Sequence, residues 1–156
     1  MLLSPHFTLK ELTYSQTAIR LGIENNPDEI AIDCLRLVCI ELLEAVRGEW
    51  GIPFSPSSGF RSPELNELIG SNAGSQHVLG QAVDFEIPGI SNLEVARWMA
   101  GNCKFDQLIL EFYEEEIPNS GWIHASIVPD LNRSEKMRYD GLLFHQGLED
   151  EEDLIA

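Results

Sequence analysis

The chain has 156 residues, with 26 acidic against 10 basic side chains and a net charge of −16. This length fits one domain, and a hydrophobic content of 44% is ordinary for a globular protein. Lysine and arginine are too few for sequence-independent nucleic-acid binding, which depends on neutralising phosphates. No apolar stretch approaches the ~20 residues of a membrane span, so we expect no stable membrane insertion. We expect a single domain over residues 1–148, followed by a solvated acidic tail over residues 149–156.

The start of the sequence and the cysteines both bear on the compartment. Residues 1–6 lack the long apolar region of a signal peptide. Cys34, Cys39 and Cys103 form no CxxC pair, which argues against a disulfide framework or a thiolate metal site. We therefore expect synthesis in the reducing cytosol, and any target outside the cytoplasm must be reached by another route.

Helices dominate the first third of the chain. Thr8 and Glu11 form a capping-box pattern that predicts a short helix over about residues 9–14. Residues 15–21 predict another helical turn. Over about residues 28–49, apolar side chains recur at three- and four-residue spacing, which predicts the longest amphipathic helix. The apolar positions of this helix are Ile32, Leu35, Val38, Cys39, Leu42, Leu43 and Val46. We expect this apolar stripe to be the main packing partner of a sheet.

Strands dominate the remainder. Ser62 and Pro63 predict the start of a short helix, and a capping-box pattern at Ser91 and Glu94 predicts a helix ending near Asn102. The segments predicted to be strands are residues 52–61, 81–87, 105–112 and 122–128, with a further short strand or strap in residues 136–144. This order indicates an α+β fold, in which a central antiparallel sheet has the N-terminal helices packed on one face.

Three residues in this second half point to a metal site. His77 lies in a loop, whereas Asp84 and His124 lie in two apolar strands. A carboxylate within an apolar strand needs a partner, because burying an unpaired charge is costly. Two histidines and one carboxylate form the protein part of a catalytic zinc site, with a fourth position left for water. Gly80 allows the chain to turn between His77 and Asp84, but spacing alone does not separate a metal site from hydrogen-bonded core histidines.

Several ordered motifs resemble a known family. They are Ser75-x-His77-x-x-Gly80-x-Ala82-x-Asp84, Trp122-x-His124, residues 58–62 with Asn66, residues 4–12, and residues 105–109. Over about residues 3–128 the chain resembles the zinc D-alanyl-D-alanine carboxypeptidase family, most of all its small phage- and prophage-encoded branch. The resemblance implies a zinc ion held by His77, Asp84 and His124. It also implies hydrolysis of peptidoglycan peptides and an α+β fold shared with hedgehog-like zinc domains. We expect a monomer that reaches the cell wall after phage-type release or delivery.

Further residues receive roles from zinc chemistry and from the resemblance. Arg61 matches the arginine that the family uses near substrate, and its planar fork suits a peptide carbonyl or carboxylate; a surface salt bridge is the alternative. Ser75 and Gln76 precede the first ligand. They either contact substrate, orient His77 through hydrogen bonds, or only shape the loop. Trp122 is a residue of the sheet core or of a cleft wall.

The general base is the point at which the sequence departs from many relatives. They place an acidic residue three positions before the last histidine ligand, where this chain has Gly121, and residues 117–123 contain no Asp or Glu. If residues 105–112 pair with 121–128, Glu111 falls opposite His124 or one rung away, on the same face of the sheet. A one-residue slip would point Glu111 away. The alternatives are the turn residues 114–116, or a site without a carboxylate base.

The sequence thus supports three functions. The leading hypothesis is a zinc peptidase of cell-wall peptides, acting either as a carboxypeptidase that removes terminal D-alanine or as an endopeptidase lysin. The second is a metal-stabilised binding module for the cell wall, and the third is a structural phage component without activity. The position of Glu111 separates the first from the others.

Overall fold

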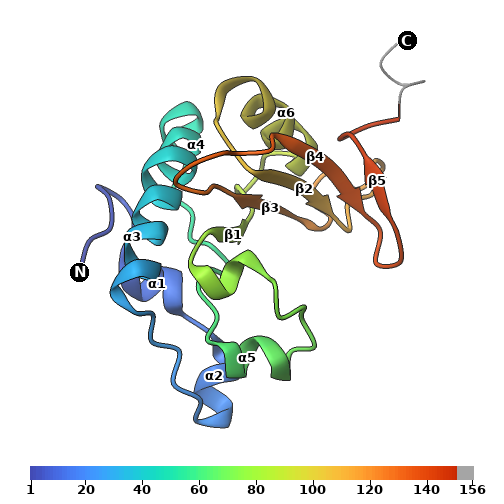
Figure 1. The fold of residues 1–156 in the computed structure, drawn as a ribbon. Helices are drawn as coiled ribbons and strands as arrows, with labels where there is room; N and C mark the ends of the chain where they lie inside the picture. The colour runs from blue at the N-terminus through green and yellow to red at the C-terminus, as the bar shows by residue number, and fades with distance from the viewer. Residues whose placement is uncertain (151–156) are drawn as a thin grey trace.

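The computed structural model describes residues 1–150 and places helices beside a twisted sheet (Figure 1). The N-terminal helices are α1 (Leu9–Thr13), α2 (Gln16–Leu21), α3 (Glu29–Val38), the π-helical turn η1 (Cys39–Leu43) and α4 (Glu44–Trp50). The predicted capping box at the start of α1 is confirmed. The Thr8 hydroxyl accepts from the Glu11 backbone N–H at 3.2 Å, and the Glu11 carboxylate accepts from the Thr8 N–H at 2.9 Å.

The helix predicted over residues 28–49 is one continuous helix made of α3, η1 and α4. Asp28 begins it, because its carboxylate accepts from the Ala31 N–H at 2.8 Å. The predicted apolar positions from Leu35 to Val46 are all fully buried in the hydrophobic core, but the main helical partner of the sheet is the later helix over residues 92–102. The π-helical turn was not predicted, because it inserts one residue into the helix without changing the apolar pattern around it.

A five-stranded sheet forms the second part of the chain. Its elements are α5 (Pro63–Leu68), the 3₁₀ helix η2 (Gln76–Leu79), β1 (Ala82–Phe85), α6 (Asn92–Asn102), β2 (Gln107–Glu111), β3 (Trp122–Ser126), β4 (Glu135–Tyr139) and β5 (Phe144–Gln146). The strand order is β1-β3-β2-β4-β5. This confirms the α+β class with N-terminal helices, and the sheet is mostly antiparallel.

One pair of strands differs from the expected antiparallel pattern, since β2 and β4 run parallel. The end of β3 lies beside the start of β2, where Ala125 pairs with Leu108. Residues 127–134 then cross past the start of β2. As a result β4 enters at the outer edge of β2 and runs in the same direction.

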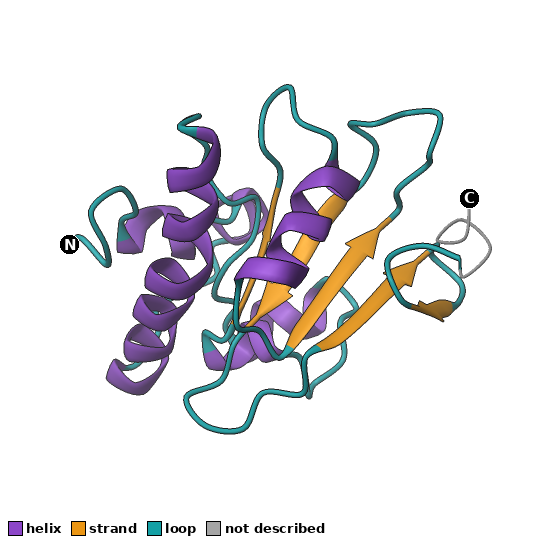
Figure 2. Ribbon diagram, turned by 90° about the horizontal axis from the view of Figure 1, so that it is seen from above, coloured by secondary structure: helices purple, strands orange, loops and turns teal. Residues whose placement is uncertain are grey.

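The two faces of the sheet have different roles. Figure 2 shows α6 lying across one face, with the long N-terminal helix beside it. Strand residues on this covered face join the apolar stripe and α6 in one hydrophobic core; they are Val83, Phe85, Leu108, Leu110, Ile123 and Ala125. Because side chains alternate along a strand, Asp84, Glu111, Trp122 and His124 project from the opposite face.

Two local predictions are wrong. Residues 52–61 form no strand, because Pro53 and Pro56 lack the N–H groups that a ladder needs. They form an irregular strap, which has an isolated β-bridge to β1 between Ser58 and Asp84. Ser91 begins α6, but its side chain makes no capping hydrogen bond.

The end of the described chain lies against the sheet. Glu149 pairs with Arg97 of α6, and Asp150 pairs with Arg138 of β4 at 2.7 Å. Residues 151–156 of the predicted acidic tail lie outside the described residues. Within residues 1–150, no helix combines the length and apolar character needed to cross a bilayer.

Candidate metal centre

His77, Asp84 and His124 come together on the uncovered face of the sheet. Asp84 of β1 pairs directly with His124 of β3, so their side chains share that face. Asp84 Oδ1 lies 2.9 Å from His124 Nδ1 and 3.4 Å from His77 Nε2. One ligand atom from each residue lies within 4.8 Å of the other two. The three residues predicted from the sequence are therefore one group that could hold a metal.

The turn at Gly80 explains how His77 reaches this group. η2 ends at Gly80, whose φ of +70° is a left-handed conformation that favours glycine. A Cβ there would lie 2.5 Å from the carbonyl oxygen of Ala31, so α3 passes against this turn. The chain then reverses into β1, which brings His77 and Asp84 to one point across seven residues of sequence.

A backbone carbonyl fixes the orientation of His77. Its Nδ1 lies 2.7 Å from the carbonyl oxygen of Gly59 in the strap, and the residue is only 2% exposed. Because a carbonyl can only accept, Nδ1 carries the proton and Nε2 is left as a lone-pair donor facing Asp84. Hydrogen bonds of this kind orient histidine ligands in metal sites. The role of the Gly59 carbonyl could not be predicted from the sequence, because every residue carries a backbone carbonyl.

Electrostatics favour a charged carboxylate at Asp84 and act in opposite directions on the two imidazoles. Burial opposes the charge on Asp84, but the attraction of His77 and the hydrogen bond with His124 hold its pKa well below its usual range. Burial lowers the pKa of His77, against the opposing charge of Asp84. Burial also disfavours protonated His124, yet its hydrogen bond to Asp84 and the charges of Asp84 and Glu111 raise its pKa.

The ligand group opens into a cavity of about 420 Å³, which we call the metal cavity. Its lining includes all three ligands together with Arg61, Ser75, Glu111 and Trp122. The remaining lining residues are Ser58, Ile69 and Ser71. Ser58 belongs to the motif of residues 58–62, whereas Ile69 and Ser71 have no distinguishing pattern in the sequence. Trp122 is a wall of this cavity, which answers the open question about its place.

Glu111 lines the metal cavity, although it does not pair directly with His124. Ile109 pairs with His124, and Glu111 pairs with Trp122, two residues further along. Alternation returns Glu111 to the same face as His124, in a diagonal position. Burial, followed by the charge of Asp84, raises the pKa of Glu111. The alternative turn residues 114–116 are exposed, and none of them lines the metal cavity.

Gly121 is required by the turn that positions Glu111. Its φ is +65°, and a Cβ there would lie 1.9 Å from the carbonyl oxygen of Glu111 and 2.6 Å from the carbonyl carbon of Phe112. Both of the blocking atoms belong to the backbone, which cannot move aside cheaply. The absence of an acidic side chain at this position is therefore a consequence of how tightly β2 and β3 close together.

Arg61 stands in the metal cavity without a carboxylate partner among residues 1–150. Its Nη1 donates to Asn66 Oδ1 at 3.4 Å, and its buried Nε has no hydrogen-bond partner. Burial lowers the pKa of the guanidinium, while the nearby charges of Asp84 and Glu111 oppose that effect. The salt-bridge alternative is therefore not what the structure shows, and the guanidinium keeps free donors for a ligand.

Ser75 and Gln76 occupy different positions. Ser75 lines the metal cavity, and its hydroxyl accepts from the His77 N–H at 3.3 Å, so it caps the helix that carries the ligand. Gln76 does not line the metal cavity, because its side chain donates to Asp106 Oδ2 at 2.9 Å. Of the roles considered for Gln76, this geometry corresponds to shaping the loop.

Asp106 joins that loop to the start of β4, and its loss should destabilise the fold. The buried carboxylate also accepts from Arg133 Nη2 at 2.6 Å and from the Arg133 N–H at 2.9 Å. Hydrogen bonds from Arg133 lower the pKa of Asp106 from 3.8 to about 2. This pKa shift predicts that Asp106→Asn lowers the free energy of unfolding by about 2 kcal/mol near neutral pH.

The pH dependence of this effect follows from its sign. A carboxylate with a lowered pKa stabilises the fold above its unfolded-state pKa, and the contribution disappears as the pH falls through the folded-state value. Urea unfolding should thus show the gap between wild type and Asp106→Asn narrowing as the pH drops from about 4 toward about 2. Asp130→Asn, in the exposed neighbouring loop, is the matched control and should change little. A gap independent of pH would contradict this assignment.

The three ligands fit zinc. The donor set is two imidazole nitrogens and one carboxylate oxygen, as in catalytic zinc sites with three protein ligands. A tetrahedral zinc with bonds of about 2.0–2.2 Å spaces its ligand atoms roughly 3.3–3.6 Å apart. The 3.4 Å between Asp84 and His77 matches this spacing, and the 2.9 Å between Asp84 and His124 needs only a small adjustment.

Comparison with known proteins agrees with this geometry. The family model described as Peptidase M15 matches residues 5–125, a range that contains all three candidate ligands as well as Arg61 and Glu111. A search among curated proteins gave no match. With a family model matching most of the chain and a buried His–Asp–His group on the sheet, the chain belongs to the Peptidase M15 family of metallopeptidases.

Proposed function

We propose that this protein is a zinc-dependent peptidase that hydrolyses peptides of the bacterial cell wall, resembling the phage-encoded D-alanyl-D-alanine carboxypeptidases. The observation that carries the proposal is the composition of the metal cavity. One cavity holds the His77–Asp84–His124 group, a partly buried carboxylate at Glu111 and an unpaired guanidinium at Arg61. These are the three kinds of group that peptide hydrolysis at a metal requires.

His77, Asp84 and His124 would hold the zinc ion. When bound, zinc activates a water molecule and polarises the peptide carbonyl. The protein prepares this position through the charge of Asp84 and through the Gly59 carbonyl, which keeps the His77 lone pair directed at the site. None of the three cysteines, Cys34, Cys39 and Cys103, lines the metal cavity.

Glu111 would move the proton. Its carboxylate projects from the same sheet face as His124 and lines the same cavity. As water adds to the carbonyl carbon, Glu111 accepts one proton and then delivers it to the nitrogen of the breaking C–N bond. The products are a carboxylic acid and a free amine, so Glu111 returns to its starting charge.

Arg61 would hold the substrate. It lines the metal cavity, and a planar guanidinium can donate two parallel hydrogen bonds to a carboxylate, or one to a peptide carbonyl. A terminal carboxylate at Arg61 corresponds to carboxypeptidase action, and an internal carbonyl corresponds to endopeptidase action. Ser75 lines the same space and offers a further polar contact.

The test begins with metal content and product analysis. Purified protein should bind about one zinc ion per chain. It should also release product from a peptide ending in D-Ala-D-Ala or from isolated peptidoglycan. Free D-alanine indicates carboxypeptidase action, and new amino groups without free D-alanine indicate endopeptidase action. A chelator should abolish the activity, and added zinc should restore it.

Two results would overturn the proposal. Protein that binds zinc through His77 but releases nothing from either substrate would be a metal-stabilised wall-binding or structural phage module. Protein that binds no divalent metal near neutral pH, even with zinc added, would remove the metal centre itself. His77→Ala is the reference for metal loss, because it deletes one ligand from η2 and leaves the sheet intact.

A further inference from the structure

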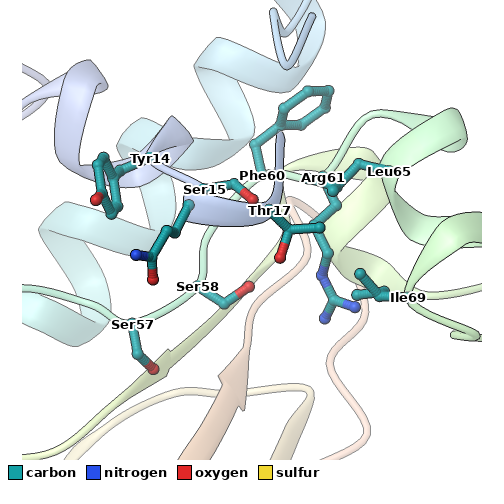
Figure 3. A pocket seen from close by; sticks show the side chains of 10 residues that line it. Tyr14, Ser15, Thr17, Ser57, Ser58, Phe60, Arg61, Leu65 and Ile69 are labelled. Atoms are coloured by element: carbon teal, nitrogen blue, oxygen red, sulfur yellow. The ribbon is translucent and has the colours of Figure 1, made fainter. Parts of the chain in front are cut away.

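A second cavity adjoins the metal cavity and shares part of its wall. Figure 3 shows this space of about 340 Å³, which lies between α2 and the strap and which we call the α2 cavity. Ser58, Arg61 and Ile69 line both cavities. A ligand that extends from the metal past Arg61 therefore enters a second formed pocket, whose size lies within the range of small-ligand sites.

Most of the polar side chains that line the α2 cavity are uncharged. Among residues 1–150, Arg61 is the only charged residue that lines it, although the protein carries 26 acidic side chains. Within residues 1–150, the side chains of Tyr14, Thr17 and Ser58 make no hydrogen bond to protein groups. By contrast, the Ser15 hydroxyl already accepts from the Ala18 N–H of α2.

Three polar side chains of the α2 cavity face one space beside apolar surface. In Figure 3, Thr17, Ser58 and Arg61 direct their polar ends into the same part of the cavity. Phe60, which is 6% exposed, and Leu65, which is 1% exposed, contribute apolar surface. Partnerless donors and acceptors beside apolar surface suit a peptide backbone with small side chains. A basic ligand would find no counter-charge here.

Arg61 marks the boundary between the two cavities. Its buried Nε lacks a partner, and its contact with Asn66 leaves further donors free. The guanidinium can donate to a substrate carbonyl that passes this point. When Arg61 binds a peptide carbonyl rather than a terminal carboxylate, the substrate chain can continue from the metal cavity into the α2 cavity.

We propose that the α2 cavity is a subsite for an extended peptide substrate, holding uncharged peptide backbone remote from the bond that is cut. This inference rests on the proposed peptidase function. Contacts remote from the reacting bond can raise the rate for longer substrates, because their binding energy helps to position that bond. The protein should then prefer long peptides to minimal ones.

The test compares a long and a short substrate on two matched variants. Thr17→Trp places an indole in the α2 cavity, and Ile19→Trp places the same indole on the solvent side of the same helix, where Ile19 is 69% exposed. The substrates are a cell-wall pentapeptide ending in D-Ala-D-Ala and N-acetyl-D-Ala-D-Ala. The ratio of kcat/KM for the long to the short peptide should fall about tenfold in Thr17→Trp and stay unchanged in Ile19→Trp.

A second readout does not depend on turnover. Backbone amide NMR signals of Thr17 and Ser57 should shift on titration with the pentapeptide and not with the short peptide. Thr17→Val, which replaces only the hydroxyl with a methyl group, should weaken these shifts. Because this change is small, it tests the subsite even if the Trp variant misfolds.

The outcomes separate the two proposals. A wild type that cleaves the pentapeptide, together with equal ratios in both Trp variants and NMR shifts confined to the metal cavity, would overturn the subsite while leaving the peptidase in place. A wild type that neither cleaves nor binds either peptide would overturn the peptidase function, and the subsite with it.

Discussion

Glu111→Gln should lower kcat about 10²- to 10⁴-fold while leaving zinc content unchanged. The amide keeps the shape of the side chain but cannot accept the proton from the attacking water. Glu111 is not among the three ligands and lies diagonal to His124, so metal binding should not depend on it. Burial raises the pKa of this carboxyl group, so its removal should not destabilise the fold. The measurement is steady-state hydrolysis alongside metal analysis of the same preparation.

Glu114→Gln is the matched control for this experiment. It makes the same chemical change at an exposed turn residue that does not line the metal cavity, and it should retain full activity. If Glu111→Gln stays active and Glu114→Gln does not, the base lies in the turn. If both stay active, the site works without a carboxylate base.

Gly121→Ala should be among the most destabilising single substitutions in the chain, with a loss of more than about 3 kcal/mol. Part of the loss is the left-handed conformation at φ +65°, and the larger part is the approach of the new Cβ to the backbone of Glu111 and Phe112. Gly121→Glu, which would imitate relatives that carry an acid at this position, should fail for the same reason and not create a better enzyme. Urea unfolding measures the loss, and soluble yield provides a second readout.

Gly89→Ala separates the two causes. Gly89 has a similar φ of +79°, but a Cβ there would meet nothing within 4 Å. It should therefore cost only the conformational part, about 1–2 kcal/mol. Equal losses in the two variants would show that the backbone around Gly121 relaxes, and would reopen this position to an acidic side chain.

The elements that the sequence predicted well are those specified by local patterns. The apolar spacing from Leu35 to Val46 identified the long helix, and Thr8 with Glu11 identified the first cap. Asp84 and His124 could be singled out because a charged or imidazole side chain in an apolar strand is unusual, and the family resemblance grouped them with His77 of the loop as candidate ligands. The prediction of a strand over residues 52–61 was wrong. The apolar residues of this segment indicated a strand, but Pro53 and Pro56 lack the N–H groups that strand pairing needs.

The parts that could not be predicted depend on tertiary placement. The pairing of Glu111 with Trp122, the parallel entry of β4 and the second cavity beside α2 arise from contacts between distant segments. From the sequence, Gly121 showed only that the acidic residue of many relatives is absent. Its close approach to the backbone of the facing strand has no sequence signature. Gln76 was assigned by its position beside His77, but its side chain points to Asp106.

Main-chain hydrogen bonds between the strap and β1 hold the metal centre in place, whereas a neighbouring connection that lines the cavity is free to vary. The Asp84 carbonyl accepts from the Ser57 N–H at 2.9 Å, and the Asp84 N–H donates to the Ser58 carbonyl at 2.8 Å, so this ligand is held by its main chain as well as its carboxylate. Ile69 and Ser71, by contrast, belong to the connection between α5 and η2, which holds none of the three ligands. Evolution or engineering can therefore exchange that connection to change what enters the site, without rebuilding the metal centre beneath it.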